Sequence, residues 1–189
     1  LDGHRRHRLY RAPRPDQALF SLALFRAAPL SYDPPQAYWD IYENHPGIPE
    51  PYIGQWAAEF DNPVADTNAP RTRRSARETR RGRAGYYGNI TFIDHQIGRL
   101  LYEFNKRDPQ AQRDTFIVFT SDHGDMMGAH RMRRKGTLPY EELYRIPCML
   151  KLPRGTRVAR AVVDDLVSSV RAPATLLKAA HIDVPAQFH

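Results

Sequence analysis

Residues 116–135 read FIVFTSDHGDMMGAHRMRRK and join a short apolar run to a dense set of polar side chains. The first four residues are β-branched or aromatic, which predicts a strand buried on both faces. Residues 120–125, TSDHGD, then follow at the carboxyl end of that strand. Open α/β folds place their ligands in the loops at this end of a parallel sheet. The stretch therefore predicts an α/β fold with a ligand site after this strand.

Asp122 and His123 are adjacent, and the turn that Gly124 permits lets both side chains point at one ion. A carboxylate suits Ca²⁺ or Mg²⁺, whereas a neutral imidazole also suits Mn²⁺ or Zn²⁺, so the residues leave the metal open. Lys135 stands thirteen residues after Asp122. An ammonium beside a divalent cation forms a pocket for a small oxyanion, such as a sulfate, phosphate or phosphonate ester. In the alternative interpretation, Asp122 caps a turn, His123 packs in the core and Lys135 is one of several solvated cations.

Several segments in a fixed order carry a resemblance to a known family. Residues 120–128, TSDHGDMMG, and 135–147, KGTLPYEELYRIP, resemble the sulfatase family of the alkaline phosphatase superfamily. Residues 86–101 are similar to the family's helix before the site strand, and residues 166–185 to a later strand and helix. The resemblance covers residues 32–185. It implies an α/β, alkaline-phosphatase-like sandwich with a mostly parallel central sheet flanked by helices, of which this chain is the central and C-terminal part.

Position by position, the resemblance implies that Asp122 and His123 bind a divalent metal, with Ca²⁺ expected first and Mn²⁺ or Mg²⁺ as alternatives. It implies that Lys135 contacts the oxyanion of an ester, and it makes His130 a further candidate for substrate contact. The spacing looks more like the bacterial aryl- and choline-sulfatases and phosphonate monoester hydrolases than the animal lysosomal enzymes. The implied function is metal-dependent hydrolysis of a small anionic sulfate ester. Hydrolysis of a phosphonate or phosphate ester on the same scaffold is the second hypothesis.

Two features of the family's pattern are missing from these 189 residues. The family's nucleophile lies in a Cys/Ser-x-Pro-x-Arg motif, which does not occur here. Cys148 does not match it, and the apolar run over residues 146–150 predicts a buried structural thiol at that position. Residues 28–31, APLS, stand where the family commonly reads Pro-His-x-Pro, so one proton donor to the leaving group is absent. The chain alone is therefore predicted to have negligible sulfatase turnover.

The chain is basic, with 28 Lys and Arg against 21 Asp and Glu and a formal charge of +7. Seven arginines fall between Arg71 and Arg83. By itself, this cluster fits a noncatalytic module that binds nucleic acid. Aromatic residues are not interleaved among the arginines, however, and no nucleic-acid-binding motif accompanies them. A solvated Arg-rich loop over residues 61–84 is the favoured prediction.

The sequence limits the compartment only weakly. A single cysteine excludes an intrachain disulfide. Residues 1–15 are basic and irregular, without an apolar signal core, and no run of about 18 apolar residues would span a bilayer. The sequence therefore predicts a soluble chain without a membrane partner. It does not choose between cytoplasm and periplasm, and it leaves the oligomeric state open.

Hydrophobic periodicity predicts the remaining elements. A helix beginning at Tyr86 has its apolar positions at helical spacing, directs Ile90, Ile93, Ile97 and Phe104 inward, and ends at Asp108-Pro109. The other expected elements are a helix over residues 36–43, a helical turn over 139–144, strands over 18–25, 148–152 and 162–170, and a helix over 172–180.

Overall fold

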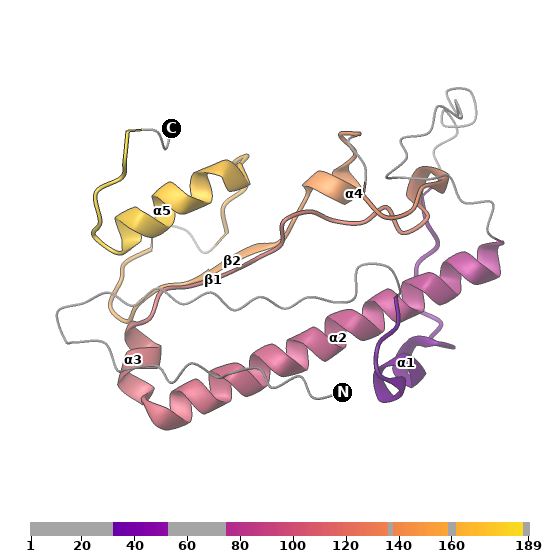
Figure 1. The fold of residues 1–189 in the computed structure, drawn as a ribbon, viewed down its shortest axis with the longest axis horizontal. Coiled ribbons are helices and arrows are strands. Elements are labelled where there is room, and N and C mark those ends of the chain that lie inside the picture. Colours follow the sequence, from indigo (N-terminus) through magenta and orange to yellow (C-terminus); the bar gives the residue numbers. More distant parts are fainter. Residues whose placement is uncertain (1–31, 53–74, 136–137, 159–161, 187–189) are drawn as a thin grey trace, which may run out of the picture. The chain divides into compact units, whose positions relative to one another are not determined.

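The computed structural model describes residues 32–52, 75–135, 138–158 and 162–186 (Figure 1). The chain divides into two compact units, residues 25–165 and residues 1–24 with 166–189, and each is described by itself. Four sequence predictions lie outside the described residues: the irregular segment 1–15, the strand 18–25, the departure at 28–31 and the portion 61–74 of the Arg-rich loop.

The long helix α2 spans Ala76–Arg107 and begins ten residues before the expected start at Tyr86. A capping box explains the early start, because the Ser75 hydroxyl accepts from the Glu78 N–H while the Glu78 carboxylate accepts from the Ser75 N–H at 2.9 Å. The helix ends as expected before Asp108, whose side chain accepts from Ala111 N–H and starts α3, Pro109–Asp114. The prediction of a loop over residues 76–84 is therefore wrong.

Two arginines in the first turns of α2, Arg80 and Arg81, contact neighbouring segments. Arg80 donates to the carbonyl oxygens of His45 and Ile48 at 2.6 and 3.3 Å. The Arg81 guanidinium lies 5.3 Å from the centre of the Trp39 ring, in cation–π geometry. These contacts attach the first turns of α2 to α1, Gln36–Tyr42, and to the segment after it.

The buried face of α2 differs from the expected one. Its buried residues are Ala84, Gly85, Gly88 and Asn89, whereas Ile90 is 48% exposed. Small residues line this face because α1 and the residues before it approach the helix backbone closely, as the position of α1 beside α2 in Figure 1 illustrates. The prediction that Ile90 packs inward is therefore wrong.

Gly85 and Gly98 provide a test of this close packing. A Cβ at Gly85 would overlap the Tyr32 carbonyl oxygen and the Trp39 ring, whereas Gly98 on the same helix has nothing within 4 Å. Gly85→Ala is expected to lower the free energy of unfolding by about 2 kcal/mol, because backbone must move. Gly98→Ala is expected to raise it by about 0.5–1 kcal/mol through helix propensity. Urea unfolding followed by circular dichroism measures both, and equal effects would contradict the packing described.

The sheet of the described residues has two antiparallel strands, β1, Ile117–Thr120, and β2, Cys148–Lys151 (Figure 1). Ile117 pairs with Lys151, and Thr120 pairs with Cys148. Both strands were expected from their apolar runs, and both are confirmed. The mostly parallel central sheet stays a prediction, since the one strand pairing in the described residues is antiparallel.

Two expectations about burial are wrong. Phe119 on β1 is 38% exposed, so this strand is not buried on both faces. Cys148 is exposed, so it is not a buried structural thiol. Both residues are exposed because, within the described residues, β1 and β2 have only each other as strand neighbours. All four residues of β2 are exposed.

The second unit contains, within residues 166–186, a 3₁₀ turn η3, Ser169–Arg171, followed by α5, Ala172–Ala179. The helix expected over 172–180 is thus confirmed. The strand expected over 162–170 is wrong, because the described residues before η3 have no regular structure and no strand there pairs with them. A bilayer-spanning helix is absent from the described part of the chain.

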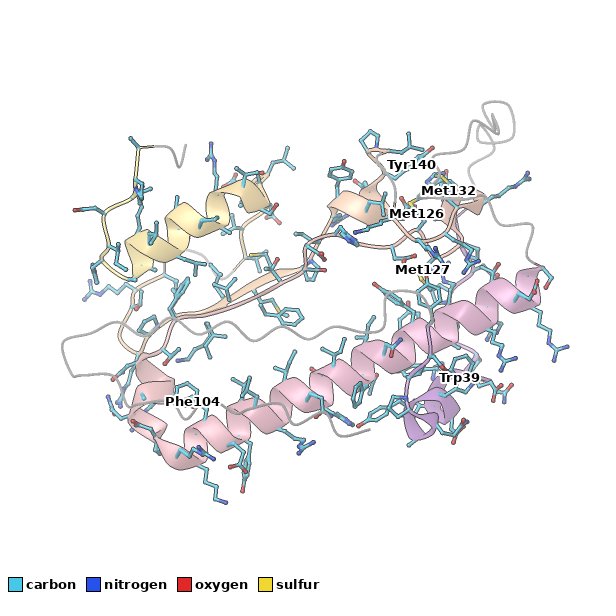
Figure 2. All side chains as sticks on the ribbon, viewed as in Figure 1. Trp39, Phe104, Met126, Met127, Met132 and Tyr140 are labelled. Atoms are coloured by element: carbon cyan, nitrogen blue, oxygen red, sulfur yellow. The ribbon has the colours of Figure 1, made fainter. Side chains whose placement is uncertain are left out.

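A small core lies behind the loop that follows β1. It contains the buried residues Met126, Ala129, Met132 and Leu143, with Tyr140 packed against them. Figure 2 shows Met126, Met132 and Tyr140 gathered beside α4, Glu141–Tyr144, which confirms the helical turn expected over 139–144. This core connects the loop to α4 and to the 3₁₀ turn η2, Ala129–Arg131.

Candidate metal and oxyanion site

Asp122 and His123 leave the end of β1 with their side chains facing each other. The His123 Nε2 atom lies 3.6 Å from Asp122 Oδ2, and the His123 backbone N–H donates to Asp122 Oδ1 at 2.9 Å. His123 Nδ1 lies 2.7 Å from the Gly124 carbonyl oxygen. Because a carbonyl only accepts, Nδ1 donates this hydrogen bond, and Nε2, on the Asp122 side of the ring, is the nitrogen that could bind a metal.

This pair is accessible and has donor atoms that fit a divalent cation. The Asp122 side chain is 84% exposed and the His123 side chain 40%, so His123 does not pack in the core. Metal bonds to oxygen and nitrogen are about 2.0–2.6 Å long, so two ligands on one ion lie roughly 3–4 Å apart. The observed 3.6 Å falls in that range. Within the described ranges no third His, Cys, Asp or Glu joins them, so the pair is a partial ligand set.

Asp122 is held in its ionised form. Partial burial raises the pKa of Asp122, but the hydrogen bond from the His123 N–H and the charge of the His123 ring outweigh it, and the net pKa lies below the ordinary value. Metal binding requires a deprotonated carboxylate. The local hydrogen bonding therefore favours the form that binds a cation.

Gly124 attaches the loop to α4. Its N–H donates to the Leu143 carbonyl oxygen at 2.8 Å, and a Cβ at this position would overlap the Glu142 carbonyl oxygen. Only glycine allows the two backbones to approach so closely. The sequence expectation that Gly124 shapes this loop is consistent with this contact.

The segment that ends at Lys135 runs back along the site loop and is joined to it by backbone hydrogen bonds. The Met126 N–H donates to the Arg134 carbonyl, and the Gly128 N–H donates to the Met132 carbonyl, both at 2.9 Å. This antiparallel pattern sets Lys135 opposite Asp125, three residues beyond Asp122, with the Lys135 residue exposed. Among the described residues, a hydrogen bond and an ion pair join Asp122 to His123. No such contact joins Lys135 to either residue in the part of the chain that the structure describes.

His130 lies in the interior. It is 7% exposed, its Nε2 atom is 3.3 Å from Glu142 Oε1, and its ring stacks on Tyr140 with centroids 4.2 Å apart. This position favours support of the loop over contact with a substrate. The neighbouring Glu141 instead makes a local i,i+4 ion pair with Arg145, at 3.8 Å.

Sequence reasoning missed two tyrosines beside the site. The Tyr32 hydroxyl lies 2.9 Å from each carboxylate oxygen of Asp125, and Oδ1 of Asp125 also accepts from the Met127 N–H at 2.9 Å. Burial raises the pKa of Tyr32, and Asp125 raises it further, so this hydroxyl remains a donor. Burial also raises the pKa of Tyr86, followed by the charges of Asp125 and Asp122. In the sequence, Tyr32 is marked only by its place in the stretch YDPP, at the start of the region that resembles the family.

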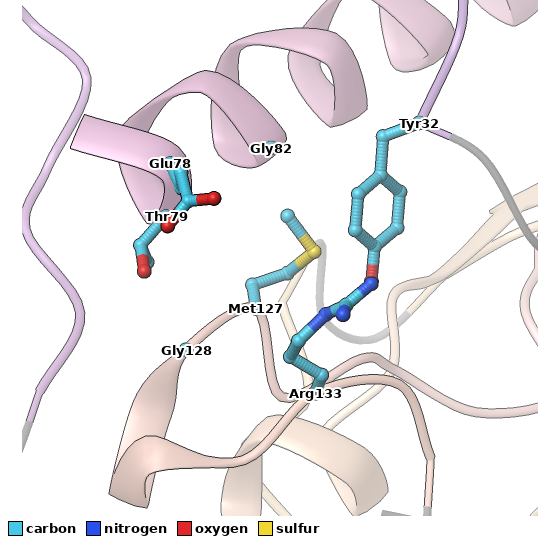
Figure 3. A pocket seen from close by; sticks show the side chains of 7 residues that line it. All are labelled: Tyr32, Glu78, Thr79, Gly82, Met127, Gly128 and Arg133. Carbon is cyan, nitrogen blue, oxygen red and sulfur yellow. The ribbon is translucent and has the colours of Figure 1, made fainter. Parts of the chain in front are cut away.

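A hollow beside Tyr32 is too small to be the ester site. Its volume is about 20 Å³, which suits a single water. Figure 3 shows the Arg133 guanidinium reaching toward the Tyr32 hydroxyl in this hollow. The lining residues are Tyr32, Glu78, Thr79, Gly82, Met127, Gly128 and Arg133. The exposed Asp122–His123 pair therefore remains the candidate site.

Comparison with known proteins confirms the resemblance seen in the motifs. A family model, Sulfatase, matches residues 27–182. An arylsulfatase of Clostridium perfringens is 39% identical over 160 residues, which cover 81% of this chain and 32% of that protein. A choline-sulfatase of Rhizobium meliloti is 27% identical over 121 residues, covering 61% and 23%.

A multifunctional alkaline phosphatase superfamily protein, PehA, of Trinickia caryophylli is 37% identical over 103 residues, covering 53% of this chain and 19% of that protein. The chain thus spans about a third or less of the length of these relatives. The family match implies an alkaline-phosphatase-like α/β fold, of which the described helices and two-stranded sheet are a part. The chain belongs to the sulfatase family.

Proposed function

We propose that this chain supplies the metal-binding and oxyanion-binding part of an enzyme that hydrolyses sulfate esters. One observation carries the proposal: the Asp122 Oδ2 and His123 Nε2 atoms lie 3.6 Å apart on an exposed loop after β1. Membership of the sulfatase family directs that site toward sulfate esters. The mostly parallel sheet of the family's fold belongs to the same proposal.

Each residue has a separate role in this proposal. Asp122 and His123 would hold a divalent cation, Ca²⁺ first, with Mn²⁺ or Mg²⁺ as alternatives. When bound, the cation supplies positive charge against the nonbridging oxygens of the ester. Lys135 would hold one of those oxygens through its ammonium group. The chain contains no Cys/Ser-x-Pro-x-Arg motif, so its own part is binding and charge stabilisation, and its turnover alone is expected to be negligible.

Sulfate binding tests these roles directly. Inorganic sulfate is expected to bind the Mn²⁺-loaded chain, and Lys135→Ala to weaken it by about tenfold, because a hydrogen bond to a charged group contributes about 1.5 kcal/mol or more. Isothermal titration calorimetry measures both affinities. Lys106→Ala, an exposed lysine in the last turn of α2, is the matched control and should leave sulfate affinity unchanged. Unchanged affinity in Lys135→Ala, or full sulfate affinity without Mn²⁺, would contradict the proposal.

Phosphonate or phosphate ester hydrolysis is the second candidate. It is favoured by the similarity to PehA, whose name describes a multifunctional member of the alkaline phosphatase superfamily. Tetrahedral oxyanions of similar size would fit the same cation and lysine. Relative rates of the complete enzyme on an aryl sulfate and the matching aryl phosphonate would distinguish the two candidates.

A noncatalytic nucleic-acid module has less support. Arg80 and Arg81 make the contacts described above, and Arg83 Nη1 lies 3.5 Å from the Met127 carbonyl oxygen. These side chains are thus engaged within the chain. Salt-dependent affinity for nucleic acid, lost on neutralising Arg77, an exposed arginine of the first turn of α2, would favour this alternative.

A further inference from the structure

The buried His130 pairs with the half-buried Glu142 of α4. The Glu142 side chain is 29% exposed, and its Oε1 atom lies 3.3 Å from Nε2 of the 7% exposed His130 side chain. The His130 backbone has φ of 52°, in the left-handed region, and its N–H donates to the Tyr52 carbonyl at 2.9 Å. A non-glycine residue in this region carries a conformational cost. The surrounding contacts hold His130 in that conformation and direct its ring at Glu142.

The pair is connected to the metal ligand by a short series of contacts. Glu142 lies in the first turn of α4, and the next residue, Leu143, accepts the Gly124 N–H at 2.8 Å. The Gly124 carbonyl in turn accepts from His123 Nδ1 at 2.7 Å. A shift of α4 away from η2 would therefore move the carbonyl that fixes the His123 tautomer and ring orientation.

We infer that His130 and Glu142 are positioning residues for the metal ligand His123, acting through α4 and Gly124. The inference rests on the proposed metal site and adds to it a pair that touches neither cation nor ester. Groups that orient a metal-bound histidine change metal affinity by about 10–100-fold when they are removed. The His123 side chain is 40% exposed, and its Nδ1 atom contacts the Gly124 carbonyl, so the position of that carbonyl bears directly on the orientation of the ring.

Mn²⁺ affinity, measured by electron paramagnetic resonance titration of the full chain, tests the inference. Glu142→Ala and His130→Ala are each expected to weaken binding by about tenfold, within the range for such groups. The double variant is expected to be no weaker than either single variant, because both remove one connection. Glu142→Gln keeps an acceptor oxygen for His130 and should stay near the unsubstituted affinity.

Glu141→Ala is the matched control, since Glu141 stands on the same helix, is exposed and pairs with Arg145. Its Mn²⁺ affinity should not change. Thermal melting without metal is measured for every variant. If Glu142→Ala and His130→Ala lose their fold along with their affinity, the pair holds the core in general and the inference is overturned.

The outcomes separate this inference from the proposed function. If the unsubstituted chain does not bind Mn²⁺, the proposed function fails and the inference falls with it. If the chain binds Mn²⁺ and Asp122→Ala loses it, while Glu142→Ala and His130→Ala bind as before, the inference alone is overturned. Tenfold weaker binding in both, with an intact fold and an unaffected Glu141→Ala, supports it.

Discussion

Gly124→Ala is expected to lower the free energy of unfolding by about 3 kcal/mol and to remove Mn²⁺ binding, the largest combined effect of any single substitution considered. The added Cβ would overlap the Glu142 carbonyl oxygen, which is backbone and cannot rotate away as a side chain would. Relief requires moving α4 from the loop, which breaks the hydrogen bond from the Gly124 N–H to the Leu143 carbonyl. The same movement displaces the Gly124 carbonyl that accepts from His123 Nδ1.

Urea unfolding and Mn²⁺ titration measure the two effects of Gly124→Ala. Gly98→Ala is the control, because the same methyl group is added where nothing lies within 4 Å. It should leave Mn²⁺ affinity intact. A Gly124→Ala protein that unfolds at the original urea concentration and binds Mn²⁺ normally would refute the close contact between the loop and α4.

Asp122→Ala is expected to weaken Mn²⁺ binding by at least about 100-fold, the upper end of the effect for groups that only support a ligand. Its Oδ2 atom is one of the two donors that face each other across 3.6 Å. Stability should change by less than about 1.5 kcal/mol, since the fold loses a hydrogen bond from the His123 N–H at an exposed position. Loss of affinity with little loss of stability is the signature of a ligand.

Calorimetric titration with Mn²⁺, alongside thermal melting, checks this second prediction. Asp94→Ala replaces an exposed aspartate on α2 and removes the same charge from the chain, so it controls for a general electrostatic effect. It should bind Mn²⁺ as the unsubstituted chain does. Equal weakening in both variants would mean that Mn²⁺ responds to net charge and not to a site at Asp122.

Local patterns predicted the elements that depend on neighbouring residues alone. The apolar runs marked β1 and β2, and Asp108-Pro109 marked the end of α2. The start of α2 was placed too late because the apolar periodicity begins at Tyr86, whereas the helix begins at the Ser75–Glu78 capping box. That S-x-x-E signal was present in the sequence and outweighs the polar, Arg-rich composition that favoured a loop.

Burial depended on tertiary packing and was predicted less well. Ile90 matched a helical apolar stripe, but α1 packs on the small-residue face of α2 instead. Cys148 and Phe119 lie in apolar runs, yet their exposure is set by which other segments cover the sheet. Hydrophobic pattern alone does not specify that cover.

The contacts at the site likewise include some that adjacent residues predict and others that only the fold reveals. Asp122 and His123 are adjacent, so their convergence was predictable from a carboxylate, an imidazole and a glycine in series. The contact of Tyr32 with Asp125 joins residues 93 positions apart, and only the fold reveals it. Glu142 and Arg145 are three residues apart in the sequence, but the fold brings Glu142 to the buried His130 instead.

The most direct test of the metal pair is pulsed electron paramagnetic resonance of Mn²⁺ bound to the chain. Coordination by His123 Nε2 predicts a ¹⁴N coupling from a directly bound imidazole, present in the unsubstituted protein and abolished in His123→Ala. Bound Mn²⁺ without that coupling, or a coupling that persists in His123→Ala, would contradict the assignment of Asp122 and His123 as the ligands of one ion.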